Sequence, residues 1–321
     1  MNLTDTRETL LITGINGFIG TNLVEYFSSR YTIYGVDIHQ HPKKGVERTV
    51  SWDQLDLLPP VDAVIHLAGI AHDTSNKEKG DLYFKVNVGL TGKIYDWFRA
   101  SGASRFFFFS SIKAAAEKPG EMTLDESVEP SPAGPYGESK RKAEEYILSQ
   151  QPATNRIGLT QNVYILRPAM IHGPGNKGNL TSLYRYVKSG MPWPLGAFTN
   201  QRSFCSIDNL LFVLEKMLSE TIPSGIYHLA DDECLSTTQL VSSIAGGVGR
   251  ELKSLAVPVA LVKLLAAGGS LLHLPFNKER LRKLTENFIV SNAKLKSALA
   301  IPTLPVTAKE GILKTIRSFN R

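Results

Sequence analysis

The residues best suited to acid–base chemistry are Tyr136 and Lys140, in the stretch PYGESK. Residues four apart lie on one face of a helix, so the two side chains would be neighbours. A tyrosine exchanges protons near neutral pH only if its ordinary pKa of about 10 is lowered, and a lysine ammonium one turn away lowers it. Ser111 directly follows the apolar run RFFFF, and its hydroxyl is suited to holding a substrate oxygen. A solvated tyrosine and lysine on a polar helix is the alternative, but the three residues together predict proton transfer coupled to hydride transfer.

A glycine-rich stretch near the N-terminus, LLITGINGFIG, predicts where a cofactor would bind. An apolar run ends in Gly14, Gly17 and Gly20, and a helical pattern follows. Gly14 permits the turn, Gly17 lets the backbone approach a ligand, and Gly20 lets helix and strand pack closely. The free N–H groups and the dipole of the helix favour a phosphate there. The GxxGxxG spacing is one residue wider at its start than the usual dinucleotide fingerprint, and an ordinary strand–helix turn is the alternative.

An acidic residue marks the end of the next predicted strand, YTIYGVD at 31–37. Asp37 lies 17 residues beyond Gly20, where a carboxylate accepts both ribose hydroxyls of an adenosine and repels a 2′-phosphate. The sequence therefore favours NAD over NADP. The nearby Lys43 and Lys44 would weaken that preference.

Strands alternate with helices through the first half of the chain. Further apolar strands are predicted at 61–67 and 105–109, separated by a helix over 81–100. This alternation predicts a Rossmann-type α/β fold with a doubly wound parallel sheet, whose site lies at the carboxyl ends of the strands. His66 lies within an apolar strand and is expected to be structural. Asn87 is expected to reach inward from the helix and brace a neighbouring loop.

The composition is that of an ordinary globular chain of 321 residues, and its two cysteines form neither a disulfide framework nor a metal-ligand pattern. A reducing cytoplasm is therefore expected, with no metal. The polar first residues, MNLTDTRETL, do not resemble a signal peptide. The net charge of +6 is concentrated in residues 251–321, which carry +8. Such a segment can contact nucleic acid, an acidic lipid surface or a phosphorylated small molecule, but no nucleic-acid motif accompanies it, and solvated surface is the simplest interpretation.

The apolar run at 255–274 is interrupted by Pro258, Lys263 and a Gly–Gly pair. A spanning helix needs about 20 apolar residues, so no integral membrane span is expected. We expect instead a helix that begins near Pro258, and a peripheral membrane contact remains open.

Taken together, TGINGFIG, Asp37, the HLAG at 66–69, Ser111 and YGESK resemble the extended short-chain dehydrogenase/reductase family, and within it the NAD-dependent epimerase/dehydratase branch. The resemblance implies that Tyr136 is the acid/base, that Lys140 lowers its pKa and binds the nicotinamide ribose, and that Ser111 holds the sugar hydroxyl. The residues assigned to NAD are Gly14, Asn16, Gly17, Phe18, Ile19, Gly20, Asp37, Asp56, Leu67, Ala68, Gly69, Asn87, Tyr136 and Lys140.

By the same resemblance, residues 1–168 form the NAD-binding domain, to which part of the later chain returns. Residues 169–321 mainly form a smaller α/β substrate-binding domain. Asn179 and Arg202 match positions that contact a nucleotide diphosphate, and an arginine fork suits phosphate oxygens. Arg282, or alternatively Arg280, is expected to serve the same anion. A homodimer is expected, formed through the segments 81–100 and 134–148.

The reaction is narrowed by the two residues after Ser111. Family members that remove water at C4–C6 resemble one another in an Asp–Glu pair there, whereas this chain has Ile112 and Lys113. An isoleucine transfers no proton, so a 4,6-dehydratase is disfavoured. What remains is hydride transfer at a sugar carbon. The SSIK and PYGESK stretches and the late basic segment KERLRKLTENFIVSNAKL resemble the O-antigen-type subgroup of this family. That resemblance implies hydride chemistry at C4 of a UDP-sugar, of the N-acetylhexosamine type, in surface-polysaccharide synthesis. A 4-epimerase, a 4-keto-6-deoxy-sugar reductase and a non-catalytic NAD-binding scaffold all stay open.

Overall fold

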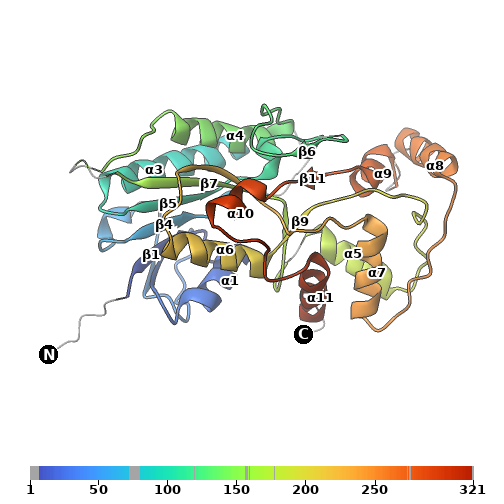
Figure 1. The fold of residues 1–321 in the computed structure, drawn as a ribbon, viewed down its shortest axis with the longest axis horizontal. Coiled ribbons are helices and arrows are strands. Elements are labelled where there is room, and N and C mark those ends of the chain that lie inside the picture. Colours follow the sequence, from blue (N-terminus) through green and yellow to red (C-terminus); the bar gives the residue numbers. More distant parts are fainter. Residues whose placement is uncertain are drawn as a thin grey trace.

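The computed structural model describes residues 7–71, 80–118, 120–155, 158, 160–176, 178–272, 274 and 276–319. A parallel seven-stranded sheet organises the first part of the chain, with the strand order β10-β7-β5-β4-β1-β2-β3 (Figure 1). Each neighbouring pair is parallel, so the carboxyl ends of all the strands meet at one edge. The strands are β1 (Thr9–Thr13), β2 (Thr32–Val36), β3 (Arg48–Val50), β4 (Ala63–His66), β5 (Arg105–Phe109), β7 (Asn162–Pro168) and β10 (Gly225–Leu229). The predicted Rossmann-type fold is confirmed.

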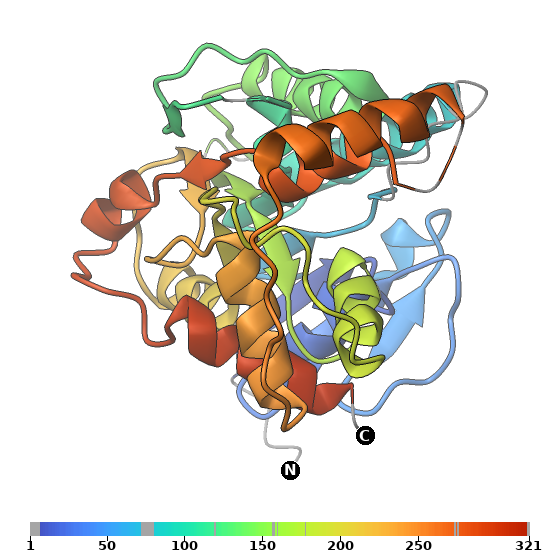
Figure 2. The ribbon, with the colours of Figure 1, turned by 90° about the vertical axis from the view of Figure 1, so that its right-hand side faces the viewer.

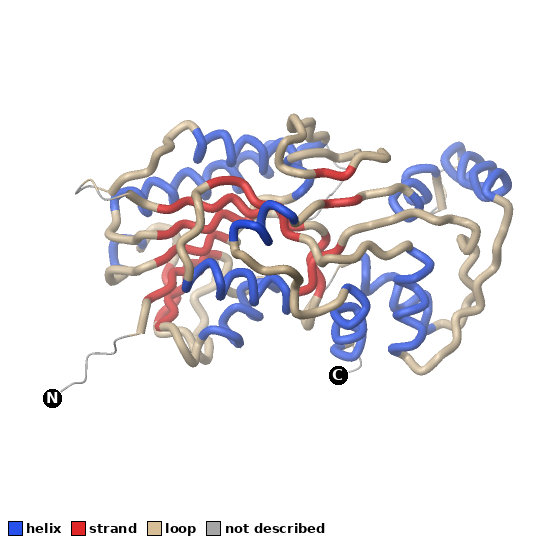
Figure 3. The backbone as a smooth tube through the Cα atoms, in the orientation of Figure 1, coloured by secondary structure: helices blue, strands red, loops and turns tan. Residues whose placement is uncertain are grey.

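Helices cover both faces of this sheet, as Figure 3 shows. Alternate residues of β1 explain the two layers, since Leu10 and Ile12 point to one side and Leu11 to the other. On the first side lie α1 (Phe18–Phe27) and α6 (Ile207–Ser219); on the second lie α3 (Gly89–Ala100) and α4 (Gly134–Leu148). Both cores are built from fully buried side chains.

The predicted helix over 81–100 is not regular. It consists of α2 (Gly80–Tyr83), a π-helical turn at Phe84–Val88, and α3. A π-turn inserts an extra residue and rotates the face that follows. The buried positions are therefore Tyr83, Asn87, Thr91, Ile94, Tyr95 and Phe98.

The second part of the chain packs around its own core, shown from its outer end in Figure 2. Reciprocal capping by Ser236 and Gln239 begins α7 (Thr237–Gly247), and capping by Thr307 and Glu310 begins α11 (Ala308–Ser318). The predicted helix after Pro258 is α8 (Val259–Leu271), which has Pro258 as its N-cap. The second part also contains α5 (Asn179–Lys188), α9 (Lys278–Thr285) and the strand pair β8 (Met170–His172) with β9 (Phe204–Ser206). By contrast, α10 (Ala293–Ala298) and the strand pair β6 (Thr123–Leu124) with β11 (Ile289–Val290) place Leu295, Leu124 and Val290 in the core on the α1 side of the sheet.

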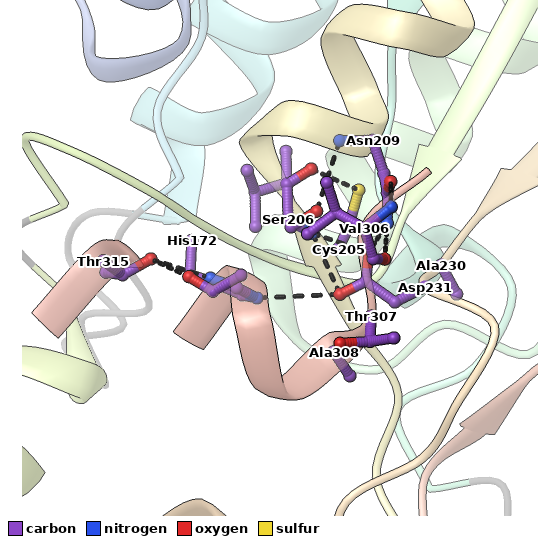
Figure 4. A network of polar contacts seen from close by, with 12 residues as sticks. His172, Cys205, Ser206, Asn209, Ala230, Asp231, Val306, Thr307, Ala308 and Thr315 are labelled. Atoms are coloured by element: carbon purple, nitrogen blue, oxygen red, sulfur yellow. Dashed lines mark hydrogen bonds and ion pairs between the residues drawn. The ribbon is translucent and has the colours of Figure 1, made fainter. Parts of the chain in front are cut away.

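The chain crosses between the two parts several times, and a buried polar network holds these crossings together (Figure 4). Asp231, just after β10, accepts hydrogen bonds from the Ser206 backbone N–H at 2.9 Å and from Asn209 Nδ2 at 2.7 Å. Its other oxygen lies 3.7 Å from Nε2 of His172, whose Nδ1 lies 3.0 Å from the Thr315 hydroxyl on α11. Strand ends of the first part are thus tied to the last helix of the chain.

None of the helices that the structure describes is long and apolar enough to cross a membrane. The most apolar of them, α8, has 13 residues, against the roughly 20 that a span requires.

Candidate active site

The glycine loop closes tightly between β1 and α1. Gly14 has φ of +69°, and its N–H donates to the Val36 carbonyl at 2.8 Å. A Cβ atom at Gly20 would lie 2.6 Å from the Gly14 carbonyl oxygen and 2.7 Å from that of Ile15. Only glycine fits there, because the atoms that it meets belong to the backbone. The first turn of α1, which contains Phe18 and Ile19, is thereby held directly under the loop.

The loops after β1 and β4 touch each other. A Cβ atom at Gly14 would lie 2.9 Å from the backbone nitrogen of Ala68, and that nitrogen donates to the Thr13 hydroxyl at 3.2 Å. Leu67, Ala68 and Gly69 therefore form the second wall of the predicted cofactor site. His66 lies behind this wall with its ring nitrogens 2.6 Å from the Thr13 hydroxyl and 3.0 Å from the Thr91 hydroxyl. Burial keeps its pKa well below the usual value, as expected of a structural histidine.

Asp37 faces the glycine loop, as its position at the end of β2 predicts. One carboxylate oxygen accepts the Asn16 N–H at 3.0 Å and the other accepts the His39 N–H at 3.3 Å. Lys43 is not a free cation beside it: its Nζ donates to the Ile15 carbonyl at 2.7 Å and to the Thr21 hydroxyl at 2.9 Å. Lys43 therefore holds the loop. Asp56 is exposed in the short 3₁₀ helix at Leu55–Leu57, after β3.

Ser111 and Tyr136 meet at the carboxyl end of β5. Ser111 caps the 3₁₀ turn Ile112–Ala114 by accepting the Lys113 N–H at 3.2 Å. Its hydroxyl also hydrogen-bonds the phenol of Tyr136. Burial raises the pKa of Tyr136, while the hydrogen bond from Ser111 acts in the opposite direction. The pKa of Tyr136 therefore lies above its usual value, because desolvation of the phenol outweighs the hydrogen bond from Ser111. That Lys140 lowers this pKa stays a prediction.

Lys140 is buried behind this pair. Its Nζ donates to the Phe109 carbonyl at 2.8 Å and lies 5.0 Å from the centre of the Phe108 ring. Burial lowers the pKa of Lys140 to about 8, and the Glu144 carboxylate works against that shift. A Cβ atom at Gly69 would lie 3.3 Å from this ammonium, so the lysine reaches the wall of the cofactor site.

Asn87 braces a loop, as predicted from its place in the helix. Its Oδ1 accepts the Ile70 N–H at 2.8 Å, and its Nδ2 donates to the Ile70 carbonyl at 3.2 Å and the Ser139 hydroxyl at 2.9 Å. The amide of Asn87 is thus hydrogen-bonded to protein groups. It supports the predicted cofactor site by holding the loop that begins at Gly69.

Two of the predicted anion-binding residues lie close together in the second part. Arg202 donates a hydrogen bond to the Lys283 carbonyl in α9. Burial lowers the pKa of Arg202, with Glu286 opposing and Arg282 adding to that shift. Arg282 in turn pairs with Glu286 at 2.7 Å. Arg280 is exposed on the same helix, and Asn179 is the first residue of α5, with its side chain outside the described part.

A buried ionic network beside the site was not predicted from the sequence. Glu144, one turn after Lys140, accepts hydrogen bonds from Ser110 at 2.5 Å and from Arg167 Nε at 2.8 Å and Nη2 at 2.6 Å. Glu144 and Arg167 are both fully buried. The available signal was an arginine inside the apolar strand NVYILRP, where an isolated charge is costly and demands a partner.

Comparison with known proteins identifies the group to which this arrangement belongs. A sequence model described as "NAD dependent epimerase/dehydratase family" matches residues 10–230. The chain belongs to this family. The match takes in β1 to β10 and all the site residues named above up to Arg202.

Individual known proteins are similar to most of the chain. UDP-glucose 4-epimerase from Vibrio cholerae is 30% identical over 330 aligned residues, covering 97% of this chain and 95% of that protein. N-acetyl-alpha-D-glucosaminyl-diphospho-ditrans,octacis-undecaprenol 4-epimerase from Escherichia coli O157:H7 is 27% identical over 263 residues, or 79% and 77% of the two chains. In fold, the chain matches the structure of MoeE5 in complex with UDP-glucuronic acid and NAD, with a TM-score of 0.75, 21% identity and coverage of 98% and 99%.

The chain is therefore an NAD-dependent enzyme of the epimerase/dehydratase family, and its residues fit the cofactor. The glycine loop leaves no room for side chains at Gly14 and Gly20, and Asp37 presents carboxylate oxygens beside it. Bound NAD supplies a hydride acceptor and donor. After Ser111, the buried Ile112 and the Glu117-paired Lys113 offer no carboxylic acid for loss of water.

Proposed function

We propose that the chain is a nucleotide-sugar 4-epimerase that acts on a UDP-sugar of the N-acetylhexosamine type. In this proposal it supplies a surface-polysaccharide pathway in the cytoplasm. The observation that carries the proposal is the hydrogen bond between Ser111 and Tyr136 at the sheet edge that also bears the glycine loop and Asp37. Two of the relatives reported above are named as 4-epimerases, which supports the choice of carbon.

The mechanism follows from what these side chains can do. Tyr136 would take the proton of the C4 hydroxyl as its phenolate and later give it back, while Ser111 would donate a hydrogen bond to the same sugar oxygen. The ammonium of Lys140 stabilises the phenolate by its charge. Bound NAD would supply both the acceptor and the donor of the C4 hydride, which is what inversion at this carbon requires. No net oxidation results.

We assign the diphosphate of the substrate to Arg202 and Arg282, and also to Asn179 at the start of α5. The two guanidinium groups lie close enough to affect each other, with Glu286 as a carboxylate partner beside them, and their forked donors match phosphate oxygens. We assign residues 1–168 and the returning β10 to cofactor binding and most of residues 169–321 to the substrate. A homodimer through the segments 81–100 and 134–148 is part of the same proposal.

A lipid-linked sugar is a second candidate substrate. The relative from Escherichia coli is named for a sugar joined through a diphosphate to undecaprenol. In this chain Arg282 lies on α9. The neighbouring helix, α8, exposes several leucines, including Leu264 at 69% and Leu271 at 80%. The same diphosphate-binding residues would serve either substrate.

The decisive experiment offers the purified chain UDP-GlcNAc, UDP-glucose and a UDP-4-keto-6-deoxy sugar, each with NAD or NADH. Products are followed by NMR and NADH by absorbance. We expect C4 epimerisation without net change in NADH. Stoichiometric NADH consumption would instead identify the reductase, and NAD binding without any turnover would identify a scaffold.

Two variants connect that activity to the site. Tyr136→Phe should lower kcat by about 10²–10⁴-fold while NAD still binds. Arg202→Gln should weaken UDP binding by roughly tenfold or more in calorimetry, because a charge-assisted contact is lost. Arg317→Gln, an exposed arginine on α11, is the charge-matched control and should leave UDP affinity unchanged. Equal effects of the two arginine variants would contradict the assignment.

A further inference from the structure

An exposed apolar face runs along α8. Leu261, Leu264, Leu265 and Leu271 are 46%, 69%, 59% and 80% exposed. At 3.6 residues per turn they fall, with Leu272, within an arc of about 120°. The opposite seam of α8, formed by Val262, Ala266 and Gly269, is buried. The leucines therefore form one continuous exposed face of α8, and the other side of the helix contributes to the core.

Contacts with the segment that follows α8 hold this helix in place. Gly269 approaches the chain after α8 so closely that an added Cβ atom would overlap the Phe276 carbonyl. The Ser270 hydroxyl accepts the Lys278 N–H at 3.0 Å, and the Leu274 N–H donates to the Gly269 carbonyl at 2.8 Å. These contacts lock α8 and α9 into a hairpin whose inner seam is closed. The hairpin forms the outer end of the molecule, at the far right of Figure 1 and across the upper front of Figure 2.

The charges around the leucines are basic. Residues 251–286 contain six Lys or Arg and three Glu, for a net charge of +3. Two of the glutamates are neutralised locally, since Glu279 pairs with Lys283 at 2.8 Å and Glu286 with Arg282 at 2.7 Å. Lys278 and Arg280 have no ion-pair partner among the described side chains, and both are exposed.

We propose that α8 and α9 dock on the surface of an anionic phospholipid bilayer, with the leucines in the acyl boundary and Lys263, Lys278 and Arg280 at the phosphate level. An apolar helix face flanked by lysine and arginine is the pattern of helices that lie in the membrane interface. A surface for another copy of the chain needs no basic border. This inference is independent of which sugar is epimerised.

The test measures co-sedimentation of the full-length protein with phosphatidylcholine vesicles that either contain or lack phosphatidylglycerol. Binding should require the anionic lipid and weaken with added salt. Lys278→Gln/Arg280→Gln should lower the partition coefficient roughly 25-fold, at about fivefold for each basic residue. Leu264→Ser/Leu265→Ser should lower it by roughly tenfold or more. Leu57→Ser, at a 55% exposed leucine of the sheet domain, is the matched control and should bind as the parent does.

Three results would overturn the inference. The first is no binding to anionic vesicles, and the second is equal loss in Leu57→Ser. The third is a leucine variant that turns a dimer into a monomer by light scattering while vesicle binding is kept, which would make the face an interface between copies. NAD binding and thermal melting verify that each variant is folded. Epimerisation of a free UDP-sugar without vesicles gives a separate readout, so failure of docking and failure of the proposed activity are distinguishable.

Discussion

The Nζ atom of Lys140 donates a 2.8 Å hydrogen bond to the carbonyl of Phe109, the last residue of β5. This contact holds a buried ammonium at the sheet edge, between the glycine-lined wall and the Ser111–Tyr136 pair. A carbonyl is a neutral partner, so it compensates the loss of water only in part. The consequence is a lysine whose pKa is lowered to about 8.

Activity should therefore depend on the protonation of Lys140. The charged form, which supports the phenolate, is present below pH 8 and lost above it, so kcat/KM of the wild type should fall as the pH rises through about 8. Lys140→Met should lower kcat/KM by roughly 10²-fold or more, and its residual activity should lack this basic limb. The measurement is a pH profile of kcat/KM for both proteins. An identical basic limb in the variant would assign it to another group.

The glycine loop predicts contrasting effects of adding one methyl group. Gly20→Ala places a Cβ atom 2.6 Å from the Gly14 carbonyl oxygen, so the loop must shift. We expect about 1–3 kcal/mol of destabilisation and a tenfold or greater loss of NAD affinity. Gly89→Ala, within α3, meets nothing within 4 Å and should stabilise the fold by about 0.5–1 kcal/mol. Urea unfolding and NAD titration check both variants, and unimpaired NAD binding by Gly20→Ala would refute the tight-loop account.

Removing one member of the buried pair of Glu144 and Arg167 should lower the free energy of unfolding strongly, whereas replacing both by apolar residues should lower it much less. Glu144→Gln leaves the Arg167 guanidinium buried without a counter-charge, which should destabilise by about 3–5 kcal/mol. Glu144→Met/Arg167→Met removes both charges and should recover most of that loss. Equilibrium unfolding in urea measures each free energy. If the double variant is no more stable than the single one, hydrogen bonding of Ser110 to Glu144 matters more than the charge balance.

Acid should destabilise the fold through His228, at β10 of the sheet. This side chain is fully buried, and burial followed by the Arg167 charge lowers its pKa to about 4. The unfolded chain titrates near 6.5, so between these values the unfolded state binds more protons than the folded state. Stability present above pH 6.5 is lost as the pH falls toward 4, by up to about 3 kcal/mol at roughly 1.4 kcal/mol per unit. His228→Gln should show a shallower loss in urea unfolding between pH 7 and 4.5, and an unchanged slope would contradict this assignment.

Features set by neighbours in the sequence were predictable, because short patterns determine them. Gly14, Gly17 and Gly20 between a strand and a helix specify the loop, and the four-residue spacing of Tyr136 and Lys140 specifies a shared helix face. The ends of parallel strands then bring Asp37 and Ser111 to one edge.

Features set by burial or by distant contacts were not predictable in the same way. The direction of the Tyr136 pKa depends on how far the phenol is desolvated, which no spacing encodes. Arg202 and Arg282 are 80 residues apart and meet only because α9 folds back onto the loop before β9. The π-helical turn in 81–100 was also not predictable from hydrophobic periodicity, because that pattern assumes a constant number of residues per turn.

The position of β10 has a consequence for synthesis of the protein on the ribosome. When residue 168 has been made, six of the seven strands of the sheet exist, and β7 presents an unpaired edge until residues 225–229 arrive. The stretch made in between includes α5, β9 and α6, and α6 packs on α1 through the 2.5 Å contact of Glu215 with Tyr26. The sheet of the nascent chain therefore cannot be completed before these later elements have emerged, and the two parts of the chain mature as one cooperative unit rather than in succession.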